Sequence, residues 1–437
     1  MAMMKGTVFA ASFLCTVCAF APSIPNRAFT AGGASSTTTT SLDAIKAGFG
    51  SSNLESCWYA AEAAVNAARE PLGDSKPSIA FVSLTAGRDV DKVLDSLGSL
   101  LGEDTPVHGL TSSGAVLTPG GSVTNGLGVL LLSSDDMNAF ATAYDAEDGS
   151  AAVAALKEKM EEQPQAILMS ATPGAEEAIV DALAETFPDV PVFGGTAADD
   201  DLSGQWKVLT NGKASGTGVS LVGIGSSVQF GASMEGPYTL PDKASVVEAT
   251  KTEGRRVFEI DGIPAADYFY DLLGEEVEEQ YKNGGLVLPQ TAQKPIGIKK
   301  PLQGLVNKFE YITAHLAAFG GEEKYVDFFV PVPEGSKLVM MESGDGPSTG
   351  YGEAMVGALE RAKLSMGEES EPKAGLMVFC GGMAIAVGDK LDSGIATVAP
   401  GIGFPLMGMT CFGEQGPLSV SGKNVQRNLS TGFVLFG

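Results

Sequence analysis

A Pro-x-x-Gly-x-Thr motif occurs three times in the chain, at residues 106–111, 191–196 and 405–410. Each copy follows an apolar run, a glycine turn and a stretch compatible with a helix, which indicates an internal repeat. Glycine lets backbone N–H groups approach a bound carboxylate, serine and threonine hydroxyls add donors, and the Glu414 carboxylate can accept from an ammonium group. The candidate ligand-binding residues are Thr111, Ser112, Ser113, Gly194, Thr196, Cys380, Thr410, Gly413, Glu414 and Asn428.

The same residue types also have structural explanations, which the sequence leaves open. Gly109, Gly194 and Gly408 are placed where strands would approach each other closely. The motif threonines fit strands in which their hydroxyls are satisfied. Glu414 and Asn428 suit turns, where acids and asparagines are common.

Cys380 supports an alternative of a different class, a cysteine-dependent enzyme. The residue ends an apolar run and enters Gly381-Gly382, where backbone N–H groups would aid a thiolate. Its general base is not evident, since the only two histidines, His108 and His315, are far away in sequence. A buried and inert cysteine is the simpler interpretation.

The sequence gives little support for a bound metal or another cofactor. Three consecutive acids at residues 199–201 resemble magnesium ligands, but such runs usually lie in solvated loops. Two histidines and no Cys-x-x-Cys in the body leave few zinc ligands. We therefore expect no metal and no cofactor.

The elements that would position these residues follow an α/β pattern. Short apolar runs bounded by turn residues indicate strands, and apolar residues at helical spacing indicate helices. The first two copies show the same order of strand, helix, strand and later strands. The expected elements are strands at 79–84, 107–110 and 127–132 with a helix at 90–101, and strands at 166–169, 192–193 and within 208–225 with a helix at 175–187.

The pattern changes after residue 230, and residues 258–270 predict a strand, an Asp-Gly turn and a helix. A third, more diverged copy begins at residue 376 and ends in a strand at 432–436. We expect mixed sheets covered by helices in two modules, 53–258 and 259–437, with the repeated loops converging on a shared hollow lined by amide hydrogens.

Charge excludes some classes of partner. The chain of 437 residues has 28 Lys and Arg against 53 Asp and Glu, a formal net charge of −25. Such a charge repels phosphate backbones and anionic membranes, so we expect no nucleic-acid partner and no membrane association of the mature form. Small molecules and other proteins remain as classes of partner.

Residues 1–52 differ in composition from the body and predict a targeting leader. They contain three basic residues and one acid, and an apolar run at 7–21 too short to span a bilayer. The segment at 18–22, Cys-Ala-Phe-Ala-Pro, resembles the cleavage motif of bipartite leaders in algae with secondary plastids. That resemblance implies a plastid stroma, with secretion as the alternative.

The motifs together resemble the FIST domains, sensory modules of signal transduction and F-box proteins. The first half is matched by residues 109–114 and 192–200, and the second by 260–265, 379–382, 408–414 and 427–431. Two positions depart from the family pattern, Met383 in place of an arginine and Arg427 in place of a histidine. The resemblance implies non-catalytic sensing of a small polar ligand such as an amino acid, with output through a separate partner. An acidic protein-interaction scaffold is a further alternative.

Overall fold

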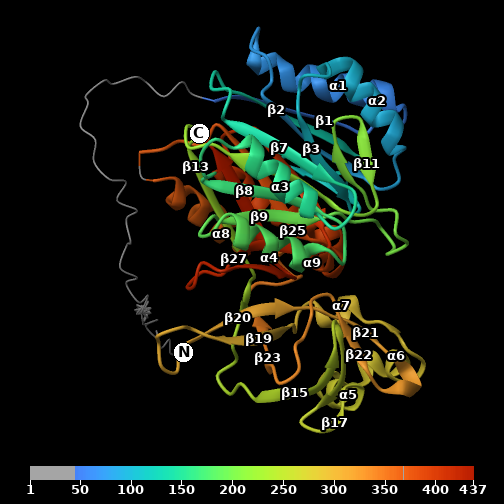
Figure 1. Ribbon diagram of the computed structural model, residues 1–437. Coiled ribbons are helices and arrows are strands. Elements are labelled where there is room, and N and C mark those ends of the chain that lie inside the picture. Colours follow the sequence, from blue (N-terminus) through green and yellow to red (C-terminus); the bar gives the residue numbers. More distant parts are fainter. Residues whose placement is uncertain (1–44, 368) are drawn as a thin grey trace, which may run out of the picture. The chain divides into compact units, whose positions relative to one another are not determined.

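The computed structural model describes residues 45–367 and 369–437 (Figure 1). Most of the expected leader lies outside these residues. Its last part, Lys46–Ser52, forms strand β1, which pairs antiparallel with β6 along its full length. None of the helices in the described part of the chain is long and apolar enough to cross a membrane.

The three repeats build three six-stranded mixed sheets of the same plan. In each sheet two parallel strands lie at the centre, antiparallel strands follow on one side, and a short hairpin follows on the other. The strands are, in sheet order, β1 (Lys46–Ser52), β6 (Leu127–Ser133), β2 (Ile79–Thr85), β3 (Val107–Ser112), β10 (Val208–Thr210) and β11 (Lys213–Ser215); β7 (Phe140–Asp145), β12 (Val219–Ile224), β8 (Ala166–Ala171), β9 (Val192–Thr196), β27 (Glu414–Pro417) and β28 (Asn424–Arg427); and β13 (Phe230–Glu235), β29 (Thr431–Phe436), β25 (Ala374–Cys380), β26 (Leu406–Cys411), β4 (Ala115–Thr118) and β5 (Gly121–Thr124).

The hairpins are exchanged between the copies in a closed cycle. The hairpin β10–β11 of the second copy extends the first sheet beside β3, and β27–β28 of the third copy extends the second sheet beside β9. The hairpin β4–β5 of the first copy completes the cycle beside β26 in the third sheet. Each copy is therefore incomplete without another.

The inner faces of the three sheets share one apolar core, which includes Phe81, Leu168, Phe193, Met407 and Phe436. Helices cover the outer faces through separate clusters, as Figure 1 shows for α3 and α4 over β8 and β9. These helices are α1 (Cys57–Arg69), α2 (Val90–Leu101), α3 (Ser150–Lys159), α4 (Glu176–Thr186), α8 (Gly352–Met366), α9 (Gly381–Val387) and α10 (Leu391–Val398). The expected α/β class with mixed, helix-covered sheets is confirmed.

Residues 246–340, called here the inserted lobe, form a nine-stranded sheet with its own core. The chain enters and leaves the lobe through the two-stranded pair of β14 (Tyr238–Thr239) and β24 (Glu342–Ser343). The lobe contains β18 (Gly285–Leu286), β21 (Leu316–Phe319), β22 (Val326–Phe328), β16 (Arg256–Ile260), β15 (Val246–Glu253), β23 (Lys337–Met340), β19 (Ile296–Pro301), β20 (Phe309–Ala314), β17 (Ile263–Pro264), α5 (Ala265–Leu273), α6 (Glu278–Asn283) and α7 (Leu288–Thr291). The strand, turn and helix expected at residues 258–270 are confirmed.

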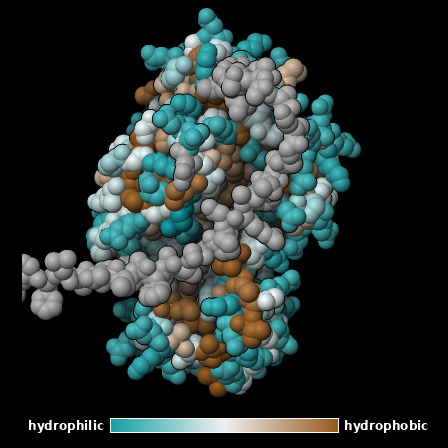
Figure 2. Space-filling model, turned by 90° about the vertical axis from the view of Figure 1, so that its left-hand side faces the viewer, coloured by the Kyte–Doolittle hydropathy of each residue, from teal (hydrophilic) through white to brown (hydrophobic). Residues whose placement is uncertain are grey.

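The described surface carries both hydrophilic and apolar side chains. Figure 2 shows one face on which hydrophilic areas surround smaller hydrophobic patches. Large apolar side chains such as Met137 and Val306 are nevertheless exposed. Single exposed apolar residues are normal on a folded protein.

Candidate functional site

The three repeated motifs meet at the carboxyl ends of their strands. In each copy the carbonyl of the motif threonine accepts a hydrogen bond from the residue two positions beyond the threonine of another copy. The three bonds run from Ala198 N to Thr111 O at 2.8 Å, from Phe412 N to Thr196 O at 3.1 Å and from Ser113 N to Thr410 O at 3.1 Å. They form a closed ring that joins all three sheets.

The prediction of a hollow at the motif glycines is wrong. The space around Gly109 and Gly194 is filled by apolar side chains, among them Phe193 and Met409, and only about 20 Å³ remains. A Cβ on Gly194 would lie 1.8 Å from the Met169 carbonyl oxygen, and one on Gly408 would lie 2.6 Å from Leu117 Cβ. These glycines therefore serve close packing, and the ring consumes three of the amides expected to face a ligand.

A cavity of about 190 Å³ lies instead just beyond the ring, and we call it the Cys380 cavity. Its walls come from the carboxyl ends of β3, β9, β25 and β26 and from the inserted lobe. The lining residues are Ser113, Asp199, Asp200, Asp201, Leu202, Leu286, Leu288, His315, Phe329, Cys380, Gly382, Ile385 and Phe412. The carboxyl ends of parallel strands are the usual place for ligand sites in α/β proteins.

His315 supplies a hydrogen-bond acceptor to this cavity. Its Nε2 lies 3.2 Å from the Leu288 carbonyl oxygen, which can only accept, so Nε2 carries the proton and Nδ1 is a bare lone pair. Burial lowers the pKa of His315 to about 4, although the bond to Leu288 opposes this shift. The ring is therefore neutral at pH 7.

The acidic loop that follows β9 forms another wall. Asp199 is buried, and its carboxylate accepts from the backbone N–H groups of Leu202, Gly204 and Gln205, so it organises the loop. One oxygen of Asp200 accepts from Gly114 N at 2.6 Å, which ties this loop to the turn after β3. Asp200 and Asp201 are exposed at the rim.

Cys380, which lines the cavity, and Glu414 behind it form a buried pair of acidic groups. Burial raises the pKa of the Cys380 thiol well above its usual value, and the neighbouring Glu414 carboxyl raises it further. Burial also raises the pKa of Glu414 well above its usual value, against the opposing effects of Ser430 N–H, Cys380 and Arg427. Both groups are therefore held in their neutral forms.

Two tyrosines extend this buried polar group. The hydroxyl oxygens of Tyr238 and Tyr351 are 3.5 Å apart, and that of Tyr238 donates to the Ala292 carbonyl in the inserted lobe at 2.7 Å. Burial raises the pKa of Tyr351 to about 12. The group stays uncharged near neutral pH.

The structure separates the ten candidate residues into two groups. Ser113 and Cys380 line the Cys380 cavity. Asn428 lies behind it, with Oδ1 accepting from His315 N at 3.3 Å and Nδ2 donating to Phe412 O at 3.4 Å.

The other candidate residues are buried or hydrogen-bonded within the protein. Thr111 Oγ1 accepts from Lys207 N, and Ser112 Oγ accepts from Thr410 N. Thr196 Oγ1 donates to Glu176 Oε1 and accepts from Gln415 Nε2. A Cβ on Gly413 would lie 2.0 Å from Gln426 Nε2. Glu414 has no exposed surface.

Several lining residues were not among the candidates. His315 comes from the inserted lobe, and its spacing from Cys380 gives no signal of their proximity. The sequence did contain a signal for Phe412 and Asp199, because both follow a motif threonine within three residues, as Ser113 does. Extending each motif by three positions would have included them.

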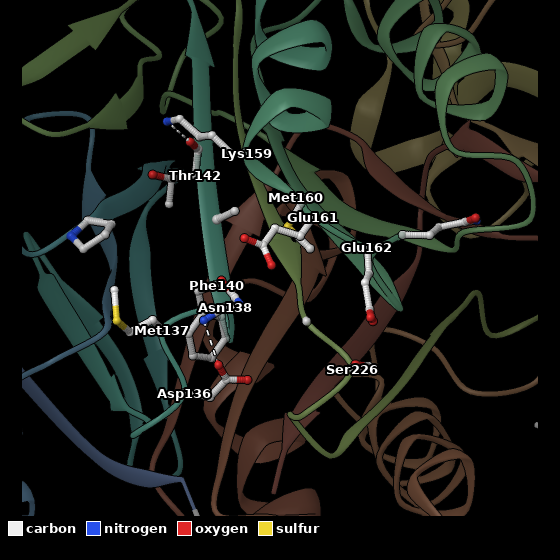
Figure 3. A pocket seen from close by; sticks show the side chains of 14 residues that line it. Asp136, Met137, Asn138, Phe140, Thr142, Lys159, Met160, Glu161, Glu162 and Ser226 are labelled. Atoms are coloured by element: carbon white, nitrogen blue, oxygen red, sulfur yellow. Dashed lines mark hydrogen bonds between the residues drawn. The ribbon is translucent and has the colours of Figure 1, made fainter. Parts of the chain in front are cut away.

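A second cavity, of about 420 Å³, lies beside the edge strand β7 (Figure 3). Lys159 Nζ donates to the Thr142 carbonyl of that strand at 2.6 Å, and Asp136 accepts from Asn138 N at 2.9 Å. The lysine thereby covers part of a free sheet edge, a common protection against strand pairing. None of the ten candidate residues lines this cavity, so the Cys380 cavity is the better candidate site.

Models of known protein families match most of the chain. A family model of the FIST N domain matches residues 78–263, and one of the FIST C domain matches residues 265–417. The two segments meet within the inserted lobe. A search of curated proteins finds no match.

Proposed function

Because the chain belongs to the FIST family, we propose that it is a non-catalytic sensor that binds a small ligand in the Cys380 cavity. FIST domains are associated with signal transduction and with the sensing of small ligands. An amino acid is within the proposed ligand class. Output passes through a separate protein, and a plastid stroma is the proposed location.

One observation carries the proposal: strand ends from all three copies and the inserted lobe together enclose a single cavity. The lobe contributes His315 and Leu288 to one side, and the repeats contribute Ser113, Cys380 and Phe412 to the other. A ligand in this place contacts both parts and is able to change how they pack. Such differential contact is what a binding signal requires.

The test uses full-length protein purified under native conditions and mass spectrometry of whatever small molecule it retains. Ile385→Trp fills the cavity from an exposed wall position, and Leu364→Trp at an exposed site of α8 is the matched control. We expect wild type and Leu364→Trp to retain the same molecule, and Ile385→Trp to lose it. Equal retention by Ile385→Trp would show that the ligand binds elsewhere.

The cysteine-dependent enzyme has one observation in its favour, because His315 lines the same cavity as Cys380. The protonation states argue against it. Burial raises the pKa of Cys380 and lowers that of His315, so neither a thiolate nor an imidazolium is favoured. Nucleophilic cysteines need the opposite shift.

A further inference from the structure

We propose that the ligand of the Cys380 cavity is a protonated organic amine with a small apolar body and no carboxylate. This inference rests on the proposed function and narrows the ligand class. The cavity offers acceptors, negative charge and apolar walls, whereas three backbone amides beside it are already engaged and Ser113 is the only hydroxyl among its described lining residues. An ammonium group on a short hydrocarbon satisfies all of these properties.

The first support is the unpaired acceptor of His315, a side chain only 1% exposed. The Leu288 carbonyl fixes the proton on Nε2, so Nδ1 presents a lone pair. The adjacent Gly382 keeps this side of the ring accessible, since a Cβ there would lie 2.8 Å from Nδ1. Among the described residues no hydrogen bond engages Nδ1, and a ligand N–H would supply its partner.

The second support is the charge around the cavity. Asp200 and Asp201 lie at its rim, and no Lys or Arg among the described residues lies within ion-pair distance of either. The described lining residues also include no Lys or Arg. A cation is attracted to this site, and the net charge of −25 adds to the attraction.

The third support is the scarcity of donors for a carboxylate, since the Ser113 hydroxyl is the only hydroxyl among the described lining residues. The amides of Ser113, Ala198 and Phe412 are bound in the ring. Leu429 N donates to the Cys380 sulfur at 3.3 Å, and the N–H groups of Gly382 and Met383 act to lower the pKa of this thiol against the effect of its burial. A ligand carboxylate would therefore meet carboxylates and a neutral imidazole, which is unfavourable.

The apolar walls complete the site. Leu286, Leu288, Phe329, Ile385 and Phe412 surround the polar groups. The volume corresponds to roughly six water molecules at ~30 Å³ each, which suits a short branched hydrocarbon with one polar end.

The experiment is calorimetry of full-length protein with four probes that share one hydrocarbon. 3-Methylbutylamine carries only the ammonium group, 3-methylbutanol is neutral, 4-methylpentanoate carries only the carboxylate, and leucine carries both charges. We expect the amine to bind at least about tenfold more tightly than each of the others, equivalent to roughly 1.4 kcal/mol. Tighter binding of leucine or of the carboxylate would overturn the inference and leave the proposed function standing.

Variants locate the interaction. Asp200→Asn keeps the acceptor for Gly114 N but removes the charge, and we expect amine binding to weaken roughly threefold to tenfold. Asp181→Asn, at an exposed position of α4, removes the same charge elsewhere and is the control. Equal effects of the two variants would show that only net charge matters and would overturn the site.

His315→Phe tests the acceptor separately, because phenylalanine keeps a planar ring but has no nitrogen to accept a ligand N–H, and we expect amine binding to weaken at least about tenfold. Circular dichroism checks that this variant folds, and Asp200→Asn remains decisive if it does not. Absence of amine binding to wild type would end the inference. Ligand retention and its loss in Ile385→Trp would still decide the proposed function independently.

Discussion

Glu414 illustrates how strongly one buried carboxyl depends on its surroundings. The residue has no exposed surface, and one of its oxygens accepts from Ser430 N at 3.0 Å. Burial outweighs the attraction of Arg427, whose guanidinium is committed to the carbonyls of Met234, Gly416 and Pro417. The carboxyl group is therefore protonated in the folded protein under conditions in which it ionises in the unfolded chain.

This difference predicts a pH-dependent effect of Glu414→Gln. Because the folded-state pKa lies above the unfolded one, the stability linked to this proton is complete below about pH 4.5 and is lost as the pH rises through the folded-state pKa. Glutamine cannot ionise. We expect the stability of the variant relative to wild type to rise with pH by up to about 1.4 kcal/mol per pH unit.

Urea unfolding of both proteins between pH 5 and pH 8 measures this difference. Glu185→Gln, at an exposed position of α4, reports the effect of removing a surface carboxyl. A difference between Glu414→Gln and wild type that stays constant across this range would contradict the assignment.

At the scale of single residues, the sequence indicated Ser113 and Cys380 but could not indicate how the other candidates are used. A threonine in a repeat has the same letter whether its hydroxyl faces a ligand or, as at Thr196, bonds Glu176 and Gln415. The proximity of His315 to Cys380 depends on the placement of the inserted lobe. No local pattern encodes that placement.

Among the elements, the parallel strand pairs depend on glycine at one register position. Gly109 pairs with Val82, Gly194 with Met169 and Gly408 with Met377, which are equivalent positions of the three copies. A Cβ at Gly194 would meet a backbone oxygen that cannot move without disturbing β8. A Cβ at Gly109 would likewise meet the Val82 oxygen, whereas one at Gly408 would meet Leu117 of β4.

Gly194→Ala should therefore destabilise the protein by roughly 1–3 kcal/mol, as overpacking in cores does. Gly98→Ala is the matched control, because Gly98 lies in the interior of α2 with open space around its Cα. We expect that control to gain up to about 1 kcal/mol from helix propensity. Urea midpoints compare the two, and a neutral Gly194→Ala would refute the packing role of this glycine.

The order of strands and helices was predictable because apolar periodicity and turn residues are local signals. The strand expected at residues 79–84 is β2, and the helix expected at 90–101 is α2. The exchange of hairpins was not predictable, since β4 pairs with Met409 across nearly three hundred residues. Pairing partners of equivalent copies carry the same sequence signals, so sequence alone does not choose between them.

The whole molecule consists of a cyclic three-copy body and a lobe inserted through a narrow connection. The first sheet takes its hairpin from the second copy, the second from the third, and the third from the first. The third sheet contains strands from both sides of residue 258, namely β4, β5 and β13 before it and β25, β26 and β29 after it. The expected division into modules at that residue stays a prediction.

The connection suggests that the lobe can be removed without dismantling the body. Thr239 pairs directly with Glu342, so a short Gly-Ser linker can replace residues 240–341. The three sheets keep all of their strands, because every lobe strand pairs within the lobe's own sheet. The body loses the ion pairs of Arg255 with Glu176 and Glu177, the hydrogen bond from Tyr238 to Ala292, and the two hydrogen bonds that join Asn428 to Thr313 and His315.

We expect the shortened protein to remain folded, with cooperative unfolding, and to lose all measurable binding of 3-methylbutylamine. The reason is that Leu286, Leu288, His315 and Phe329 leave with the lobe, and the rest of the cavity then opens to water. Size-exclusion chromatography and circular dichroism establish folding, and calorimetry establishes binding. A folded variant that still binds the amine would place the site in the body alone, whereas an unfolded one would show that the lobe is part of the folding unit.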